Sequence, residues 1–176
     1  MIQNVIIGWK KRYMSKEYLY SPWRIKYILS EKENKCIFCE RNETGNGNEL
    51  SLLVHQTTHS FVIMNLYPYN NGHLMVVPNK HVSSLSDLTQ AEITDLFLLV
   101  QKTESIIKRV FKCGGMNVGI NLGKAAGAGI DEHLHVHIVP RWFGDSNFMT
   151  TTADIRVIPE SFEDSVKKLR DAFNHE

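Results

Sequence analysis

Three histidines stand at alternate positions of an otherwise apolar run, HLHVHIV, at positions 133, 135 and 137. Alternation with a period of two predicts a β-strand, because successive side chains of a strand point to opposite faces of the sheet. The pattern therefore places His133, His135 and His137 on one face, each about 6.7 Å from the next. Imidazoles titrate near neutral pH, so this face can bind a metal, transfer protons or attack an electrophile.

Three interpretations of the histidine run remain open from the residues alone. The histidines form a solvated cluster without function, or His-x-His on a strand binds zinc. In the third interpretation, a neutral imidazole attacks phosphorus and forms a high-energy bond that a second acceptor breaks. A neighbouring histidine then binds a phosphate oxygen or protonates the leaving group. We favour the third interpretation, because three histidines on one face are improbable by chance.

The composition indicates one globular domain. The chain has 176 residues, of which 43% are hydrophobic and 22% charged, and its formal net charge is +1. This length buries a substantial core without disulfide bonds, and the charge balance predicts neither a nucleic-acid partner nor a membrane surface. The opening MIQNVIIGWKKR contains an apolar run too short for a membrane span and lacks a signal-peptide cleavage site. We expect a cytoplasmic protein, with residues 1–17 as an N-terminal extension and residues 18–176 as the domain.

Three cysteines, Cys36, Cys39 and Cys113, bear on metal binding. An odd and low count argues against a disulfide framework, and the CxxC spacing of the first two is typical of a metal or redox site. A single CxxC is a weak signal, because two reduced and partly buried thiols give the same pattern. Cys113 stands alone at the end of a helical segment, and we expect it to be structural.

The order of apolar segments predicts an α+β fold. Alternation and turn residues predict strands over residues 50–55, 60–65, 73–78 and 116–121, in addition to the histidine run. Helical spacing predicts a long helix over residues 89–111 and a C-terminal helix over residues 159–173, and Ser21 begins a short helix. Few crossover helices separate the strands, which favours an antiparallel sheet with its helices on one side.

The histidine run matches the pattern His-φ-His-φ-His-φ-φ, in which φ is apolar, and resembles the histidine-triad superfamily of nucleotide hydrolases and transferases. NLYPYNNGHLMVVPNKHVSSLSDLT is similar to a second block of that family, and NVGINLGKAAGAGIDEHLHVHIVPRWFGDSNFM to its fragile-histidine-triad branch. SPWRIKYI and GDSNFM resemble bacterial diadenosine tetraphosphate phosphorylase-like proteins. The resemblance implies a five-stranded antiparallel sheet with a long helix and a C-terminal helix, in a homodimer whose sheets join.

The resemblance implies a role for each histidine. His135 is the nucleophile on the α-phosphate, His137 contacts the phosphate and assists the leaving group, and His133 orients the strand or binds a metal. His73, in NGHLMVVP, matches the fourth histidine of the family, although from this residue alone a turn histidine that stabilises the hairpin is the preferred interpretation. In the branch that transfers nucleotides to sugar phosphates the third histidine is glutamine, so His137 disfavours that branch.

The resemblance also implies residues that bind the nucleotide. Asn65 matches a position that binds ribose hydroxyls, and Asn121 a polar residue that faces the substrate. The loop GKAAGAG lacks the Walker A spacing, but its backbone N–H groups can approach phosphate oxygens. The branch usually has a glutamine or serine in this loop, and this chain has neither. The expected nucleotide-binding residues are Asn65, Asn121, Gly127, Ala128, Gly129, His137 and Trp142.

Several bacterial members of the superfamily bind zinc through an N-terminal CxxC, a histidine after the third strand and the first histidine of the triad. The corresponding residues here are Cys36, Cys39, His81 and His133. The resemblance therefore implies a structural zinc ion, since thiolate and imidazole are its usual ligands. His55 and His59 are rival fourth ligands, but polar residues at strand ends are the simpler interpretation of both.

The expected activity is hydrolysis of dinucleoside polyphosphates through a nucleotidyl-His135 intermediate. Phosphate in place of water is the alternative acceptor and gives a phosphorylase, because the chemistry up to the intermediate is the same. Arg24 and Arg141 either hold a second anion through bidentate hydrogen bonds or pair with nearby acids. Trp142 either stacks on an adenine or packs at the end of its strand. A zinc-stabilised nucleotide-binding module without turnover is the remaining alternative.

Overall fold

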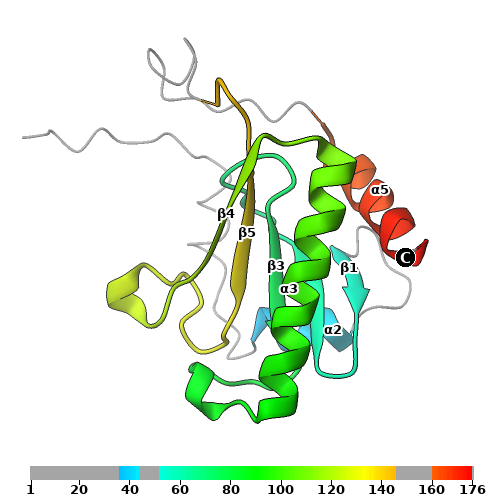
Figure 1. Cartoon of the computed structure of the whole chain (residues 1–176). Coiled ribbons are helices and arrows are strands. Elements are labelled where there is room, and N and C mark those ends of the chain that lie inside the picture. The colour runs from blue at the N-terminus through cyan, green and yellow to red at the C-terminus, as the bar shows by residue number, and fades with distance from the viewer. Residues whose placement is uncertain (1–35, 44–51, 146–159, 176) are drawn as a thin grey trace, which may run out of the picture. The chain divides into compact units, whose positions relative to one another are not determined.

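A five-stranded antiparallel β-sheet carries the histidine run (Figure 1). The computed structural model describes residues 36–43, 52–145 and 160–175. The strand order in the sheet is β1-β2-β3-β5-β4. The strands are β1 (Leu53–Gln56), β2 (Ser60–Met64), β3 (Leu74–Pro78), β4 (Gly115–Ile120) and β5 (Val136–Arg141). The predicted α+β fold is therefore confirmed.

All described residues belong to one compact unit, Glu33–Glu176. The predicted N-terminal extension, the helix predicted to begin at Ser21 and the cation Arg24 therefore fall on residues that are not described. The boundary between residues 17 and 18 stays a prediction. Within the described ranges, no helix has the length and apolarity needed to cross a membrane.

The buried hairpin of β2 and β3 presents His73. Every residue of both strands is buried, and the two strands pair antiparallel along their whole length. The connecting turn requires Gly72, whose φ of +69° is a conformation that glycine adopts without strain. A Cβ at this position would also lie 2.7 Å from Phe111 Cε2. Gly72 therefore lets the chain turn tightly and enter β3 directly after His73.

Two helices cover one side of the sheet and pack on each other. The long helix α3 (Gln90–Phe111) contacts β2, β3 and β5, and α5 (Phe162–Asn174) contacts α3 and β1. A capping box of Thr89 and Glu92 begins α3, which fixes its start at the predicted position. On α3 Leu96 is fully buried, whereas its neighbour Phe97 is 45% exposed.

The histidine run is not a regular strand along its whole length. β5 begins at Val136, so His133 and His135 precede it. The ladder with β3 ends at the pair Val76–Val136, and β3 itself ends at Pro78, which has no N–H to donate. Before β5 the chain is held by other bonds, among them Leu134 N–H to Val82 O at 2.6 Å.

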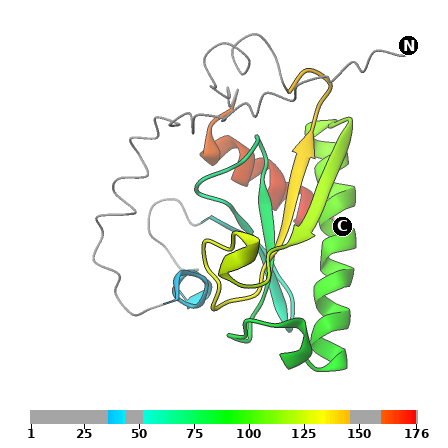
Figure 2. The same cartoon turned by 90° about the vertical axis from the view of Figure 1, so that its left-hand side faces the viewer.

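A short helix, α2 (Ile37–Glu43), contains the second cysteine of the CxxC motif and was not predicted. Figure 2 shows α2 on the side of the sheet opposite to α3. Seven residues are too few for a stable helix in isolation, so tertiary contacts must hold it. Phe38, whose side chain is fully buried, provides such a contact. Two 3₁₀ turns, η1 (Leu85–Asp87) and η2 (Lys124–Ala126), complete the described elements.

Candidate functional site

A backbone hydrogen bond fixes which ring nitrogen of His135 carries the proton. Its Nδ1 lies 2.8 Å from the carbonyl oxygen of His133, and a carbonyl oxygen only accepts, so Nδ1–H donates. In a neutral imidazole this leaves Nε2 with a lone pair. Burial lowers the pKa of His135, and the hydrogen bond to the His133 carbonyl opposes this only in part. His135 is therefore a neutral imidazole whose Nε2 can act as a nucleophile at neutral pH.

His137 carries its proton on Nε2, whereas His135 carries its proton on Nδ1. The backbone N–H of Tyr69 donates to His73 Nδ1 at 3.1 Å, so the proton of His73 is on Nε2. His73 Nε2–H then donates to His137 Nδ1 at 3.0 Å, which puts the proton of His137 on Nε2. Burial, with the neighbouring imidazoles, lowers the pKa of His73 to about 3 and that of His137 to about 4. Both residues are therefore neutral at physiological pH.

His135 and His137 thus form a pair with complementary functions. Their ring centroids are 4.8 Å apart and the planes stand at 78°. One ring offers a lone pair, and the other offers an N–H that can donate a hydrogen bond to a phosphate oxygen or to the departing oxygen of a leaving group. Gly119 of β4 lies opposite His137 in the ladder, and no described atom lies within 4 Å of where its Cβ would be. The sheet therefore leaves space beside His137 for a ligand.

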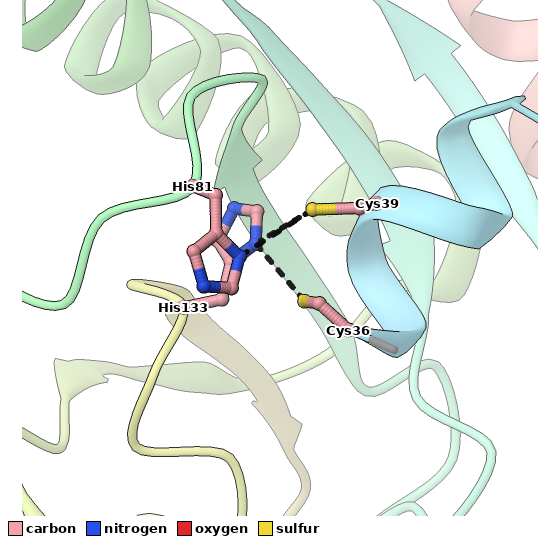
Figure 3. Close-up of side chains that lie close together, drawn as sticks. All are labelled: Cys36, Cys39, His81 and His133. Carbon is pink, nitrogen blue, oxygen red and sulfur yellow. Dashed lines mark hydrogen bonds between the residues drawn. The ribbon is translucent and has the colours of Figure 1, made fainter. Parts of the chain in front are cut away.

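Two thiols and two imidazoles form a second cluster next to the triad (Figure 3). Cys36 Sγ lies 3.2 Å from His133 Nδ1, and Cys39 Sγ lies 3.6 Å from the same atom. Cys39 Sγ is also 3.4 Å from His81 Nδ1, and one ligand atom from each of the four residues lies within 4.8 Å of all the others. The structure thus brings together the four predicted metal ligands, and the cluster can hold a metal ion.

The hydrogen bonds of His133 prepare this residue as a ligand. Its Nε2 lies 2.9 Å from the carbonyl oxygen of Pro78, so Nε2–H donates and Nδ1 keeps its lone pair toward the thiols. Burial lowers the pKa of His133, and the bond to Pro78 opposes that shift. The rival residue His55 instead stacks on Phe173 of α5, with ring centroids 4.6 Å apart. His55, His59 and Cys113 are not members of the cluster.

Phe38 connects the two clusters, and sequence reasoning missed it. Its buried ring lies with its centroid 5.4 Å from that of His133 and 5.1 Å from that of His135. It stands on α2 between the two cysteines. A large apolar residue inside a CxxC motif was the available signal, because a solvated metal loop has no need for one.

Three of the predicted nucleotide-binding residues lie on different elements around the triad. Asn65 lies beside the triad, with its Nδ2 3.2 Å from His73 Nδ1. Asn121 directly follows Ile120, which pairs with Val136 next to the triad. Trp142 follows β5 at the end away from His135 and is half-buried.

The glycine loop fills the connection between β4 and β5. Gly127 has a φ of +86°, which favours glycine, and it ends η2. Gly127 and Gly129 are exposed and Ala128 is half-buried. No described atom lies within 4 Å of a Cβ added at either glycine. The loop therefore has an open surface just before the histidine run.

Arg141 is paired with an acid, as the second interpretation of this residue expected. Its Nε donates to Asp145 Oδ2 at 2.7 Å, and its Nη1 donates to Asn117 Oδ1 at 2.9 Å. Asp145 Oδ2 also accepts from Asn70 Nδ2 at 2.9 Å and from the backbone N–H of Trp142 at 3.1 Å. Burial raises the pKa of Asp145, but the hydrogen bond from Arg141, with those from Trp142 and Asn70, outweighs this and lowers it. This network ties the β2–β3 turn to the end of β5.

Comparisons with known proteins agree with this geometry. Residues 46–144 match the HIT domain family. The AP-4-A phosphorylase of Mycobacterium tuberculosis is 48% identical over 162 residues, which cover 86% of this chain and 81% of that protein. The asymmetrical bis(5'-nucleosyl)-tetraphosphatase of Schizosaccharomyces pombe is 42% identical over 91 residues, or 52% of this chain and 50% of that protein.

A solved structure agrees as well. The crystal structure of a Zn-bound histidine triad family protein from Mycobacterium smegmatis superimposes with a TM-score of 0.64 and 26% identity. The superposition covers 81% of this chain and 95% of that protein. Sequence and fold therefore agree with the predicted resemblance, and the chain belongs to the histidine triad (HIT) domain family.

Proposed function

We propose that this protein is an enzyme that cleaves dinucleoside polyphosphates through a nucleotidyl-His135 intermediate. The observation that carries the proposal is the complementary proton placement of His135 and His137, a lone pair on one Nε2 and a proton on the other. Named relatives support the substrate class, since both the M. tuberculosis and the S. pombe proteins are named for enzymes that act on such nucleotides.

The first chemical step uses both imidazoles. His135 Nε2 attacks the α-phosphorus, a nitrogen–phosphorus bond forms, and the bond from phosphorus to the bridging oxygen breaks. His137 Nε2–H donates a hydrogen bond to the departing oxygen and stabilises its developing negative charge, so the nucleotide leaves as an anion and His137 keeps its proton. A second acceptor then attacks the phosphorus from solution and releases its proton to solvent. The nitrogen–phosphorus bond breaks, and His135 is neutral again.

Phosphate is the acceptor that we propose for the second step. The sequence favoured water as the acceptor, which would make the protein a hydrolase, and phosphate was the alternative. The relative from M. tuberculosis, which matches most of this chain, is named a phosphorylase, and this favours phosphate. The S. pombe tetraphosphatase matches about half of the chain and keeps water as the competing acceptor. The proton states of His135 and His137 serve both acceptors equally.

Product analysis distinguishes the two acceptors. Diadenosine tetraphosphate incubated with the protein and millimolar phosphate should give ADP and ATP, and removal of phosphate should suppress ADP formation by more than about tenfold. The reason is that a nucleotidyl-histidine transferred to phosphate releases a nucleoside diphosphate. Chromatographic separation of the nucleotides measures both products. Formation of AMP and ATP at the same rate with and without phosphate would instead identify a hydrolase.

Nucleotide contacts follow from the same proposal. Asn65 would contact the ribose and Asn121 the substrate beside the triad. The backbone N–H groups of residues 127–129 would approach phosphate oxygens, because the loop is open and begins the segment that leads to the histidines. Trp142 would stack on a base only if the nucleotide extends along β5.

The metal that best fits the thiol–imidazole cluster is zinc. Around a tetrahedral zinc ion, with Zn–S of about 2.3 Å and Zn–N of about 2.0–2.1 Å, a sulfur and a nitrogen ligand lie about 3.5 Å apart. The observed sulfur–nitrogen distances of 3.2, 3.4 and 3.6 Å are close to this value. Zinc would be held by Cys36, Cys39, His81 and His133, and it would supply structural cross-linking of α2 to the sheet. Reduced thiols fit a cytoplasmic location, where disulfides are rare.

A homodimer joined through β4 fits the surface of the sheet. β4 is an edge strand, and along its outer side no described strand pairs with it. Apolar side chains are exposed on β4, directly after it and on α3. These are Phe97 at 45%, Leu98 at 59%, Val118 at 49% and Leu122 at 48%. Pairing of β4 with β4 of a second copy would provide hydrogen-bond partners for the backbone groups along the outer side of β4 and extend the sheet across the dimer.

A charge at the edge strand should prevent this assembly. Val118→Glu is expected to elute as a monomer where the wild-type protein elutes as a dimer, because a carboxylate would be buried in the joined sheet. Size-exclusion chromatography with light scattering measures the mass. Leu66→Glu is the control, since Leu66 is also an exposed aliphatic residue, at 40%, but lies in the β2–β3 turn. A wild-type monomer, or a Val118→Glu dimer of unchanged stability, would contradict the proposal.

A further inference from the structure

The proton on His137 Nε2 depends on hydrogen bonds that begin in the β2–β3 turn. The bond between His73 Nε2 and His137 Nδ1, at 3.0 Å, can exist with the proton on either nitrogen. In one arrangement His73 donates and His137 carries its proton on Nε2. In the reverse arrangement His137 donates from Nδ1, and its Nε2 has no proton to give. The group that faces His73 Nδ1 decides between the two.

The side chain of Asn65 faces His73 Nδ1, and its orientation is fixed. The backbone N–H of Tyr67 lies 2.9 Å from one end of the Asn65 amide. A backbone N–H only donates, so that end is the oxygen, Oδ1. The other end, Nδ2, lies 3.2 Å from His73 Nδ1 and can only donate to it. Together with the backbone N–H of Tyr69, at 3.1 Å, two donors therefore point at His73 Nδ1.

Two donors at His73 Nδ1 exclude a proton on this nitrogen. A proton there would face two N–H groups and would leave buried donors without an acceptor, since His73 is fully buried. One of the two donors is a backbone N–H, which every residue except proline has at this position. Asn65 is the donor from a side chain, and it is the position at which the sequence controls this proton.

We propose that Asn65 is a positioning residue that fixes the proton of His137 on Nε2 through His73. This inference rests on the proposed function, in which His137 Nε2–H donates a hydrogen bond to the departing oxygen. It adds to the ribose contact that the family resemblance implies, because a donor to His73 acts on the rate of bond cleavage, whereas a ribose contact acts on binding. Asn65 would thus couple the turn that holds the nucleotide to the hydrogen-bond donor that stabilises the leaving group.

Asn65→Asp tests the inference with almost no change of shape. The carboxylate keeps an acceptor for Tyr67 N–H but replaces the donor at His73 Nδ1 by an acceptor, which favours the reverse arrangement of protons. The kcat for diadenosine tetraphosphate should fall by about 100-fold, the range expected when a hydrogen-bond donor to a developing oxyanion is lost, while KM changes by less than about threefold. An ester of AMP with 4-nitrophenol, whose leaving oxyanion needs little stabilisation, should lose less than an ester with phenol.

Two further variants distinguish proton positioning from a general effect of the added charge and from a ribose contact. Asn117→Asp makes the same amide-to-acid change on β4, where the side chain bonds Arg141 and no histidine, and its kcat should stay within about twofold of wild type. In a His73→Gln background, Asn65→Asp should cause almost no further loss of kcat, because the residue through which it acts is gone. An equal loss in both backgrounds, or a change confined to KM and to discrimination against 2′-deoxyribose, would overturn the inference.

A spectroscopic measurement tests the proton placement without turnover. In protein labelled with ¹⁵N-histidine, the ring nitrogen shifts should report a proton on Nε2 of His73 and His137 and on Nδ1 of His135. In Asn65→Asp the proton of His137 should move to Nδ1. Failure of the wild-type protein to cleave any dinucleoside polyphosphate would refute the proposed function, and these shifts would still decide the role of Asn65. A wild-type His137 protonated on Nδ1, or shifts unchanged in Asn65→Asp, would overturn it.

Discussion

Replacing His135 by alanine should reduce the turnover of diadenosine tetraphosphate by roughly 10⁴-fold or more, the scale seen when a covalent nucleophile is removed. The expectation follows from the lone pair on Nε2, which the hydrogen bond from Nδ1–H to the His133 carbonyl maintains. No neighbour can replace it, because His137 carries its proton on Nε2, the nitrogen that faces away from His73. Initial rates of nucleotide release, measured at saturating substrate, give the loss of kcat.

The fold and nucleotide binding of the His135→Ala variant should remain nearly intact. His135 makes one backbone hydrogen bond and packs against Phe38 and His137. None of these contacts is an ion pair, so the fold does not depend on a charge at this position. Thermal unfolding and equilibrium binding of AMP test this expectation. His175→Ala is the matched control, because His175 lies at the C-cap of α5, far along the chain from the triad. A His135→Ala protein that kept more than a few per cent of wild-type rate would show that the covalent mechanism is wrong.

His137→Ala should lose less activity than His135→Ala. Loss of a hydrogen-bond donor to the departing oxyanion costs about 10²- to 10³-fold, and the nucleophile stays in place. The two variants therefore differ in whether the nucleotidyl-protein intermediate forms. With substrate labelled in the α-phosphate, rapid acid-free quenching should trap labelled protein for the wild type and for His137→Ala, and none for His135→Ala. A wild-type protein that binds the nucleotide but never becomes labelled would favour the binding module without turnover.

The sheet and the long helix could be predicted from sequence, because their signals are local. Apolar segments bounded by turn residues identified all five strands within a few residues, and the helical spacing from Thr89 to Phe111 ended at the observed cap. Strands β2 and β3 are buried on both faces, so the order of the apolar segments and their turns determined the fold class, not a strict alternation of burial. The start of β5 at Val136 was not predicted, since it depends on Pro78 in a neighbouring strand, which is distant in sequence.

The site could be predicted only as a list of residue types. The triad, His73 and the four members of the thiol–imidazole cluster came from spacing and resemblance, and the structure brings them together. Their proton positions came from backbone partners such as the His133 carbonyl and the Tyr69 N–H, which leave no trace in a sequence. Helix α2 was missed because its seven residues are stabilised by Phe38 and not by their own propensity.

Loss of the proposed zinc ion should have the largest effect on stability. Cys36→Ser removes a thiolate that lies 3.2 Å from His133 Nδ1, and with it the cross-link from α2 to the segment before β5. Binding of a structural metal is coupled to folding, and a ligand present at 1,000 times its dissociation constant adds about 4 kcal/mol. For a chain of this size that loss corresponds to a fall in melting temperature of about 10 °C. Elemental analysis should find one zinc per wild-type chain after purification without a chelator, and none in the variant.

The third cysteine provides the control for this experiment. Cys113 is half-buried, packs at the edge of the core and is not a member of the cluster, so Cys113→Ser makes the same change of sulfur to oxygen without touching the metal. It should keep one zinc per chain and lose no more than a few degrees in melting temperature, as expected for a small polar change at a partly buried position. Equal losses in both variants would mean that Cys36 matters only for packing. A metal-free wild-type protein with undiminished stability would exclude the zinc site altogether, and His133 would then contribute to the triad only by presenting its carbonyl oxygen to His135.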